Sequence, residues 1–362
     1  MEPVNLEPIL APAIFALGLS FGSFLNVCIY RLPRAQSVVT PRSACPHCGD
    51  LIPLYHNVPV LSWLILRGKC RACKQPISPR YLVIELLTGL LFLSCYSHFG
   101  LTLAMLKCIV LGYLLLGLIF TDAETKLLPD AMTLPGLALG ILFSLVVPVN
   151  DLASRIIPGM VSSALRSEIS WRIWSLSDSL LGAAVGASFL YGAAAIYLHA
   201  RGVEGMGFGD VKLMAMIGAF LGTKLTVLTI FTASLAGSLF GLTTVLAVWV
   251  KRLRRIQAHA AAHPSAPIAP EIAFPTIASQ DIASPNAASP ETSSPGDPIP
   301  APLATPITAG IIVRLSPRRR AWQSARLALR FYEMPFGVFL GGMALLSFVF
   351  GNRLLHWYWR AL

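Results

Sequence analysis

The sequence predicts an all-α polytopic membrane protein with about eight helices that cross the bilayer. Hydrophobic residues make up 55% of the 362-residue chain and charged residues only 12%, about half the charged share of an average soluble domain. Several apolar runs reach the roughly 20 residues that a helix needs to span a membrane. The net charge of +11 comes from Lys and Arg that cluster between these runs. We therefore predict the lipid bilayer as a partner, and no nucleic acid.

The first predicted span is residues 12–30, which end at Arg31 and Arg34. Basic residues favour the cytoplasmic side, so this span is expected to run inward. No Lys or Arg precedes it, and it should be retained because it lacks the positive start of a cleavable signal. Segment 150–177 is expected to be an outer loop. The other spans are predicted at residues 81–96, 101–120, 131–149, 179–198, two passes within 213–249 that break near Gly222, and 336–350.

The loop between the first two spans, residues 31–80, carries two Cys-x-x-Cys pairs, Cys45 with Cys48 and Cys70 with Cys73. Four thiolates from two tight turns complete a closed tetrahedral site, the pattern of structural zinc. A loop of this size buries too little apolar area to fold alone, so the metal would stabilise it. Disulfide or redox chemistry is the competing interpretation, disfavoured by the surrounding Lys and Arg, which predict a cytoplasmic location. Iron also fits four thiolates.

Two aspartates lie where predicted spans meet the cytoplasmic side. Asp122 ends an inward span, and Asp210 begins an outward one after the glycine-rich segment 205–209. Glycines there allow positive φ angles and the close approach of another chain. An ionisable residue at the membrane edge indicates a functional site, because unpaired charge at that depth is unfavourable. For either residue alone, a helix cap or an ion pair with Lys126 or Lys212 is the structural alternative.

A pair of carboxylates at the same depth indicates aspartic protease chemistry. Two such groups share one proton, so that the ionised group takes a proton from water while the protonated group polarises the scissile carbonyl. A proton-coupled carrier is the alternative from another class, because carboxylates in membranes also move protons. A carrier needs further polar residues along its path, and the spans offer few beyond Ser20, Ser23 and Asn26. A structural scaffold would leave the matching depth of the two aspartates unexplained.

These motifs resemble the bacterial prepilin peptidases, the type IV leader peptidases of the G-x-G-D aspartic class. The resemblance covers most of the chain outside residues 150–177 and 256–309. It rests on Gly207, Gly209, Asp210 and Lys212, on Asp122 with Pro129 and Asp130, on the four cysteines, and on residues 22–27, 30–33, 57–63, 67–71 and 335–337.

The resemblance implies an enzyme of the bacterial plasma membrane whose active site faces the cytoplasm, with Asp122 and Asp210 as the catalytic residues. Its substrates would be type IV prepilins and pseudopilins, from which it would remove the basic leader after a glycine. Many members with the cysteine loop also methylate the new N-terminal residue, with S-adenosylmethionine as donor. A peptidase without methyltransferase activity is the close alternative. We expect acidic residues near the inner face to offset loop repulsion of the leader, namely Asp50, Glu124, Asp130 and Glu204.

The chain is thus expected to divide into five segments. Residues 1–30 hold the first span, 31–80 the zinc loop associated with methylation, and 81–255 the transmembrane peptidase core. Residues 256–330 form a cytoplasmic linker rich in Pro, Ala and Ser with a basic end, and 331–362 hold the last span. The composition of 256–309 predicts an extended chain without a packed core, so its deletion should spare proteolysis.

Overall fold

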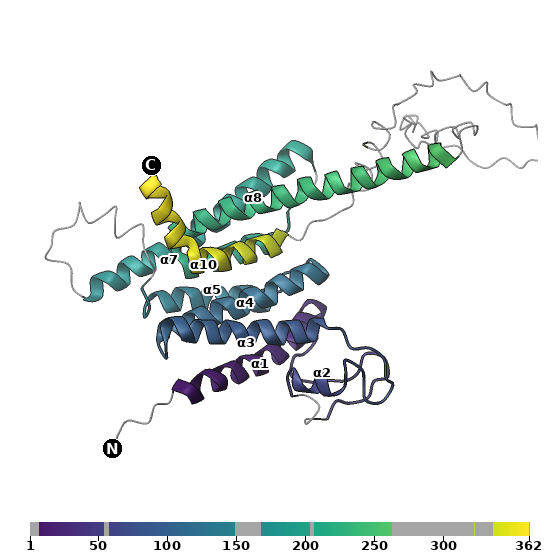
Figure 1. The fold of residues 1–362 in the computed structure, drawn as a ribbon. Coiled ribbons are helices and arrows are strands. Elements are labelled where there is room, and N and C mark those ends of the chain that lie inside the picture. The colour runs from purple at the N-terminus through teal and green to yellow at the C-terminus, as the bar shows by residue number, and fades with distance from the viewer. Residues whose placement is uncertain are drawn as a thin grey trace, which may run out of the picture. The chain divides into compact units, whose positions relative to one another are not determined.

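The computed structural model describes residues 7–53, 58–148, 168–202, 206–262, 322 and 336–361. In this part of the chain the regular elements are helices, joined in the cysteine loop by two isolated β-bridges. The helices in chain order are α1 (Glu7–Arg31), α2 (Leu61–Ile65), α3 (Arg80–Phe99), α4 (Leu103–Thr125), α5 (Asp130–Ser144), α7 (Glu168–Arg201), α8 (Phe208–Ala262) and α10 (Phe336–Ala361), as Figure 1 shows.

Five of the described helices are long and apolar enough to cross a membrane, namely α1, α3, α4, α7 and α8. Two more, α5 and α10, contain shorter apolar stretches. Because α8 consists of two helical parts that meet at Gly222, the described residues hold eight apolar helical segments. This result confirms the predicted all-α fold with about eight helices, and the chain is a multi-pass membrane protein.

The division of α8 is made by Gly222, whose φ of 74° and ψ of 172° are not helical. A positive φ of this kind favours glycine, which has no Cβ to clash with the backbone. The second part then restarts with help from α7, because the Asp178 carboxylate accepts the N–H of Thr223 at 3.3 Å. Asp178 is 1% exposed, and sequence reasoning did not single it out. Its contact with Thr223 gives it a capping role at this break.

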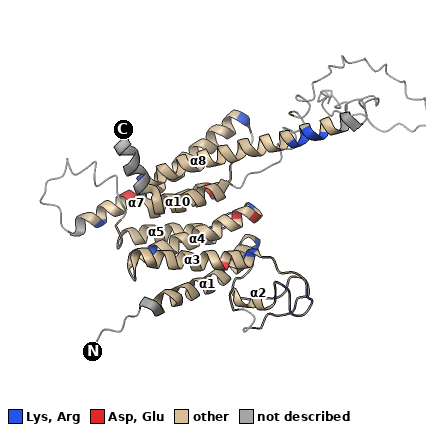
Figure 2. Ribbon diagram, in the orientation of Figure 1, with Lys and Arg blue, Asp and Glu red and all other residues tan. Residues whose placement is uncertain are grey.

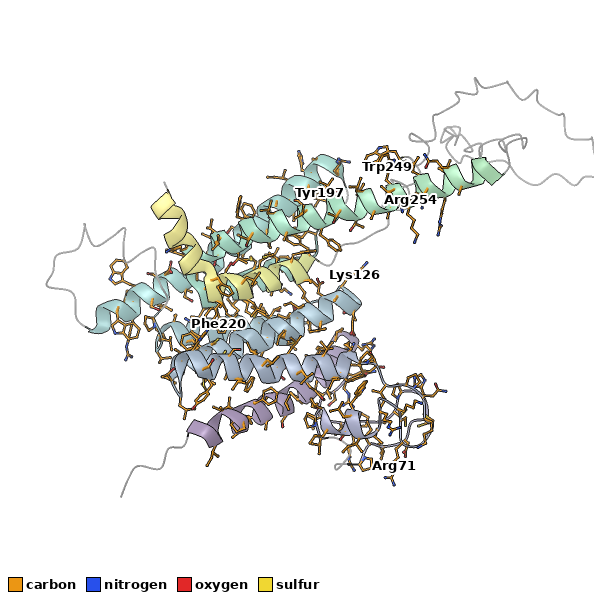
Figure 3. The ribbon with its side chains drawn as sticks, viewed as in Figure 1. Arg71, Lys126, Tyr197, Phe220, Trp249 and Arg254 are labelled. Carbon is orange, nitrogen blue, oxygen red and sulfur yellow. The ribbon has the colours of Figure 1, made fainter. Side chains whose placement is uncertain are left out.

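The two parts of α8 run in opposite directions along α10. A Cβ on Gly337, at the start of α10, would lie 3.4 Å from Asp210, and the Phe336 ring is 3.8 Å from the Cβ position of Gly237. At the far end, Leu225 is 2.7 Å from the Cβ position of Gly351. The chain therefore turns back at Gly222, as the predicted break required. Phe220 lies just before this turn, and Lys126 directly follows α4. Figure 3 shows them at opposite ends of the helices.

The chain divides into two compact units. The first comprises residues 1–241 and 333–362 and contains the helices described above up to Gly241 of α8, together with α10. The second comprises residues 242–332 and includes the basic end of α8. This helix continues to Ala262, past the predicted start of the linker at residue 256. Apart from Trp322, the predicted linker beyond 262 lies outside the described residues, and the five-segment division stays a prediction.

The predicted outer loop is shorter than expected, because α7 begins at Glu168. Trp171 and Trp174 are therefore helical. The segment 168–177 contains no Gly or Pro, and its apolar side chains recur at helical spacing. These features explain why the helix extends in front of the apolar run at 179–198. Residues 149–167 lie outside the described part.

Candidate active site

Asp122 lies in the last turn of α4 and is 5% exposed. The helix ends three residues later because Lys126 adopts a left-handed conformation with φ of 55°. The N–H of Lys126 then donates to the Asp122 carbonyl at 2.9 Å, which is the usual way to close a helix C-terminus. The carboxylate of Asp122 is thereby carried on a regular helix rather than on a loop.

Asp210 lies in the first turn of α8 and is 9% exposed. Its backbone N–H donates to the Gly207 carbonyl at 3.2 Å, so the glycine-rich segment leads directly into the helix. A Cβ on Gly209 would come within 3.0 Å of the Leu128 side chain. Gly209 thus allows the start of α8 to pack against the connection between α4 and α5. Val211 and Leu213 are buried and anchor this turn in the core.

The structure brings the two predicted carboxylates together. The position that a Cβ on Gly337 would occupy is 2.9 Å from Asp122 Oδ2 and 3.4 Å from Asp210 Oδ1. Both oxygens lie within 3.4 Å of one point, so their separation is less than twice that distance. At such a separation in a buried site, two carboxylates influence each other's charge state.

The first turn of α10 contributes a hydrogen bond to this pair. The backbone N–H of Val338 donates to Asp122 Oδ2 at 3.1 Å. Sequence reasoning did not identify this contact, although it did single out residues 335–337 as the opening of the last span. Within that motif, Gly337 is the residue at which a Cβ would contact both Asp122 and Asp210. Pro335 lies outside the described residues.

Lys212, two residues after Asp210, forms an ion pair with Asp130. The ammonium Nζ of Lys212 lies 2.7 Å from each carboxylate oxygen of Asp130. Pro129 is the residue that precedes α5, and Asp130 is in its first turn, where a negative charge is favourable. The pair therefore joins the start of α8 to the start of α5. The predicted alternative of an ion pair between Lys212 and Asp210 is replaced by this contact.

The four loop cysteines converge, as predicted from their spacing. Their sulfur atoms all lie within 4.8 Å of one another, with 3.8 Å between Cys45 and Cys73 and 4.0 Å between Cys48 and Cys70. Sulfurs at the corners of a tetrahedron, each 2.3 Å from a central ion, are about 3.8 Å apart. The cysteines are free rather than disulfide-bonded. This donor set and geometry fit a closed zinc site.

The two Cys-x-x-Cys turns are built alike. The N–H of Cys45 donates to the Asp50 carbonyl and the N–H of Cys70 to the Gln75 carbonyl, both at 2.9 Å. The loop thus offers two equivalent turns to one ion.

A buried glutamate holds the cysteine loop against the helices. Glu85, on α3 and 8% exposed, accepts the N–H of Val60 at 2.7 Å. Val60 has φ of 62° and ψ of −54°, values that a β-branched residue rarely adopts. Arg80, at the start of the same helix, forms an ion pair with Glu124.

The ion pair between Arg80 and Glu124 joins the start of α3 to the last turn of α4, two residues after Asp122. In Figure 2, charged residues gather near these helix ends, whereas the middle of both helices is almost uncharged. Of the acidic residues expected to receive a basic leader, Glu124 and Asp130 are thus in ion pairs and Asp50 lies in the cysteine loop. Glu204 lies outside the described residues.

Comparison with known proteins agrees with this arrangement. The family model of the bacterial peptidase A24 N-terminal domain matches residues 16–99, and that of the type IV leader peptidase family matches residues 109–242. The first match contains the cysteine loop and the second contains both aspartates. No solved structure matches the chain.

Curated relatives carry one common name, prepilin leader peptidase/N-methyltransferase. The protein of Myxococcus xanthus is 41% identical over 247 residues, which cover 68% of this chain and 66% of that protein. The protein of Neisseria gonorrhoeae is 36% identical over 256 residues, covering 64% of this chain and 81% of the relative. That of Aeromonas hydrophila is 35% identical over 257 residues, covering 64% and 80%. With two family domains matched in order and relatives covered over most of their length, the chain belongs to the type IV leader peptidase family.

Proposed function

We propose that the chain is a membrane aspartic endopeptidase that removes the basic leader of type IV prepilins and pseudopilins by cleavage after a glycine. One observation carries this proposal, namely the meeting of Asp122 and Asp210 at the buried ends of α4 and α8. The names of the relatives supply the substrate class. Their second named activity supports methylation of the new N-terminal residue, with S-adenosylmethionine as the methyl donor.

The reaction follows from the two carboxylates. The pair holds one proton, so one aspartate is ionised while the other is neutral. The ionised group takes a proton from a water molecule, whose oxygen attacks the scissile carbonyl carbon, and the neutral group donates its proton to the carbonyl oxygen. When the tetrahedral intermediate collapses, the C–N bond breaks and the leaving amine receives a proton. Placement of both groups on helix ends keeps them in register for these transfers.

We propose that this site faces the cytoplasm. Arg80 begins α3 and pairs with Glu124 near Asp122, and Arg31 ends α1. The aspartates thus share the end of the bundle that carries loop arginines, the arrangement expected on the cytoplasmic side of the plasma membrane. A basic leader would meet the acidic groups at this end. Glu124 and Asp130 would then contact the leader as well as their present partners, Arg80 and Lys212.

The four cysteines would hold a structural zinc ion. All four coordination positions are taken by thiolates, so the metal would stabilise the loop and would leave no open position for a substrate. We propose that this loop, residues 31–80, is associated with methylation, that 81–255 form the peptidase core, and that the segment 256–330 is a tether for the last span. Deletion of the tether should then leave proteolysis intact.

The central test is cleavage of a co-expressed prepilin, followed by the shift in gel mobility when the leader is lost. Asp122→Asn and Asp210→Asn should each lower processing by about 10⁴-fold, because neither remaining carboxylate can both accept and donate the proton. Asp281→Asn, a carboxylate change in the tether, is the matched control. Normal processing by either active-site variant, at membrane abundance equal to the wild type, would contradict the proposed pair.

Methylation needs its own assay. Purified enzyme is mixed with leader-free pilin and S-adenosylmethionine labelled in its methyl group. Transfer of label to the pilin by the wild type, and by Asp122→Asn as well, would support a second activity that is separate from the aspartate pair. An enzyme that cuts prepilin but transfers no label would be a peptidase alone.

A further inference from the structure

We infer that the first turn of α10 is part of the proposed active site, with Gly337 as a residue that positions the Asp122 carboxylate. This inference rests on the proposed peptidase function. Two contacts carry it: the hydrogen bond from the Val338 N–H to Asp122 Oδ2, and the position of Gly337 between the two carboxylates.

The hydrogen bond uses a donor that the helix itself leaves free. Helix α10 begins at Phe336, so the N–H of Val338 belongs to the first turn, where N–H groups have no partner within the helix. It donates to Asp122 Oδ2 at 3.1 Å. The aligned peptide dipoles also make a helix N-terminus favourable for a negative charge. One oxygen of Asp122 is thereby held in place by a backbone group of α10.

The absence of a side chain at Gly337 is what allows this contact. A Cβ there would lie 2.9 Å from Asp122 Oδ2, 3.1 Å from Asp122 Cγ and 3.4 Å from Asp210 Oδ1. A Cβ atom does not normally lie so close to another heavy atom. The Asp122 side chain, rather than the backbone of α10, is then the part that moves away. Even a methyl group would therefore push the carboxylate aside while the helix stays in place.

The rest of α10 is fixed against its neighbours, so it has little freedom to move away from Asp122. A Cβ on Gly341, one turn after Gly337, would lie 2.6 Å from Ile119 Cγ1 of α4, which shows that the two helices are in close contact there. On the other side, the rings of Phe339 and Phe240 of α8 are 5.3 Å apart. Leu340 is fully buried. The register of α10 is thus set by packing on both α4 and α8.

The same helix offers a matched control. A Cβ on Gly342 would meet nothing within 4 Å. Replacement of glycine by alanine inside a helix normally favours the helix, because alanine restricts the unfolded chain. Gly337→Ala and Gly342→Ala are therefore the same chemical change on the same helix, and they differ in whether the new methyl group touches the carboxylates.

The test uses the full-length enzyme, purified in detergent, with a prepilin substrate. Gly337→Ala should lower kcat on the order of 10²-fold, the usual effect of moving a catalytic group by about 1 Å, with KM within about twofold of the wild type. Gly342→Ala should retain wild-type kcat. Label transfer from S-adenosylmethionine to leader-free pilin, measured on the same preparations, should be unchanged by Gly337→Ala, because a positioning role does not affect the loop.

The outcomes separate this inference from the function on which it rests. Wild-type enzyme that cleaves no prepilin would overturn the proposed function and the inference together. Wild-type cleavage with equal kcat for Gly337→Ala would overturn the inference alone. If Gly337→Ala lowers cleavage, label transfer and membrane abundance in the same proportion, its effect is on folding, and the positioning role is refuted.

Discussion

Replacement of Glu85 by alanine should release the cysteine loop from the helix bundle. In the structure the Glu85 carboxylate accepts the Val60 N–H at 2.7 Å in a site where Glu85 is 8% exposed. Loss of the acceptor leaves a backbone donor without its partner, which costs about 1–3 kcal/mol. The positive φ of Val60 is itself unfavourable, and the bond to Glu85 helps to hold that conformation. Local opening should thus become roughly 5–150-fold more frequent.

The assay is amide hydrogen exchange, which reports local opening. Suitable reporters are Leu64, Leu66 and Gly68, whose N–H groups donate to carbonyls within this segment at 3.0, 3.0 and 2.8 Å. Their exchange should accelerate by that factor in Glu85→Ala, whereas amides in the middle of α4 should be unchanged. Glu85→Gln retains an acceptor oxygen and should show a smaller increase. Equal exchange at the reporters in all three proteins would refute the view that Glu85 anchors the loop.

Three further outcomes follow from the same contacts. A strong chelator should speed amide exchange throughout the cysteine loop but not in α4, because metal binding contributes about 10–16 kcal/mol to small zinc domains; a metal-free preparation with a fully protected loop would contradict a structural metal. Gly182→Ala puts a methyl 2.5 Å from the Gly218 carbonyl oxygen and should cost about 1–3 kcal/mol, seen as a lower thermal midpoint in detergent, whereas Gly192→Ala meets nothing within 4 Å and should not lower it. Lys212→Met removes an ion pair whose Asp130 side chain is 56% exposed, so its thermal effect should stay below about 1 kcal/mol; a larger loss would show that the pair is more than a surface contact.

The sequence was sufficient for the features that depend on spacing and depth. The four cysteines were predicted to share one site because two tight turns present thiolates in pairs, and their sulfurs do converge. Asp122 and Asp210 were predicted to lie at one membrane edge from the direction of their spans, and their carboxylates lie close together. The break at Gly222 was visible as an interruption of an apolar run.

What the sequence did not reveal depends on which backbone groups meet after the helices pack. Nothing in the pattern around Val338 shows that its N–H reaches Asp122, because this contact follows from the packing of α10 on α4. The partner of Glu85 is likewise a backbone N–H in a loop, which carries no residue-type signal. The start of α7 was missed because apolar content, rather than helical spacing, was used to bound the span.

The place of α10 in the chain has a consequence for biosynthesis. A ribosome makes α4 and the start of α8 long before it makes Gly337 and Val338, because the whole segment 263–335 must be translated in between. Both aspartates are thus inserted while the donor to Asp122 does not yet exist. On the geometry described above, the nascent chain carries the proposed catalytic pair without its contact to α10, and we expect full activity only once the last helix has entered the membrane.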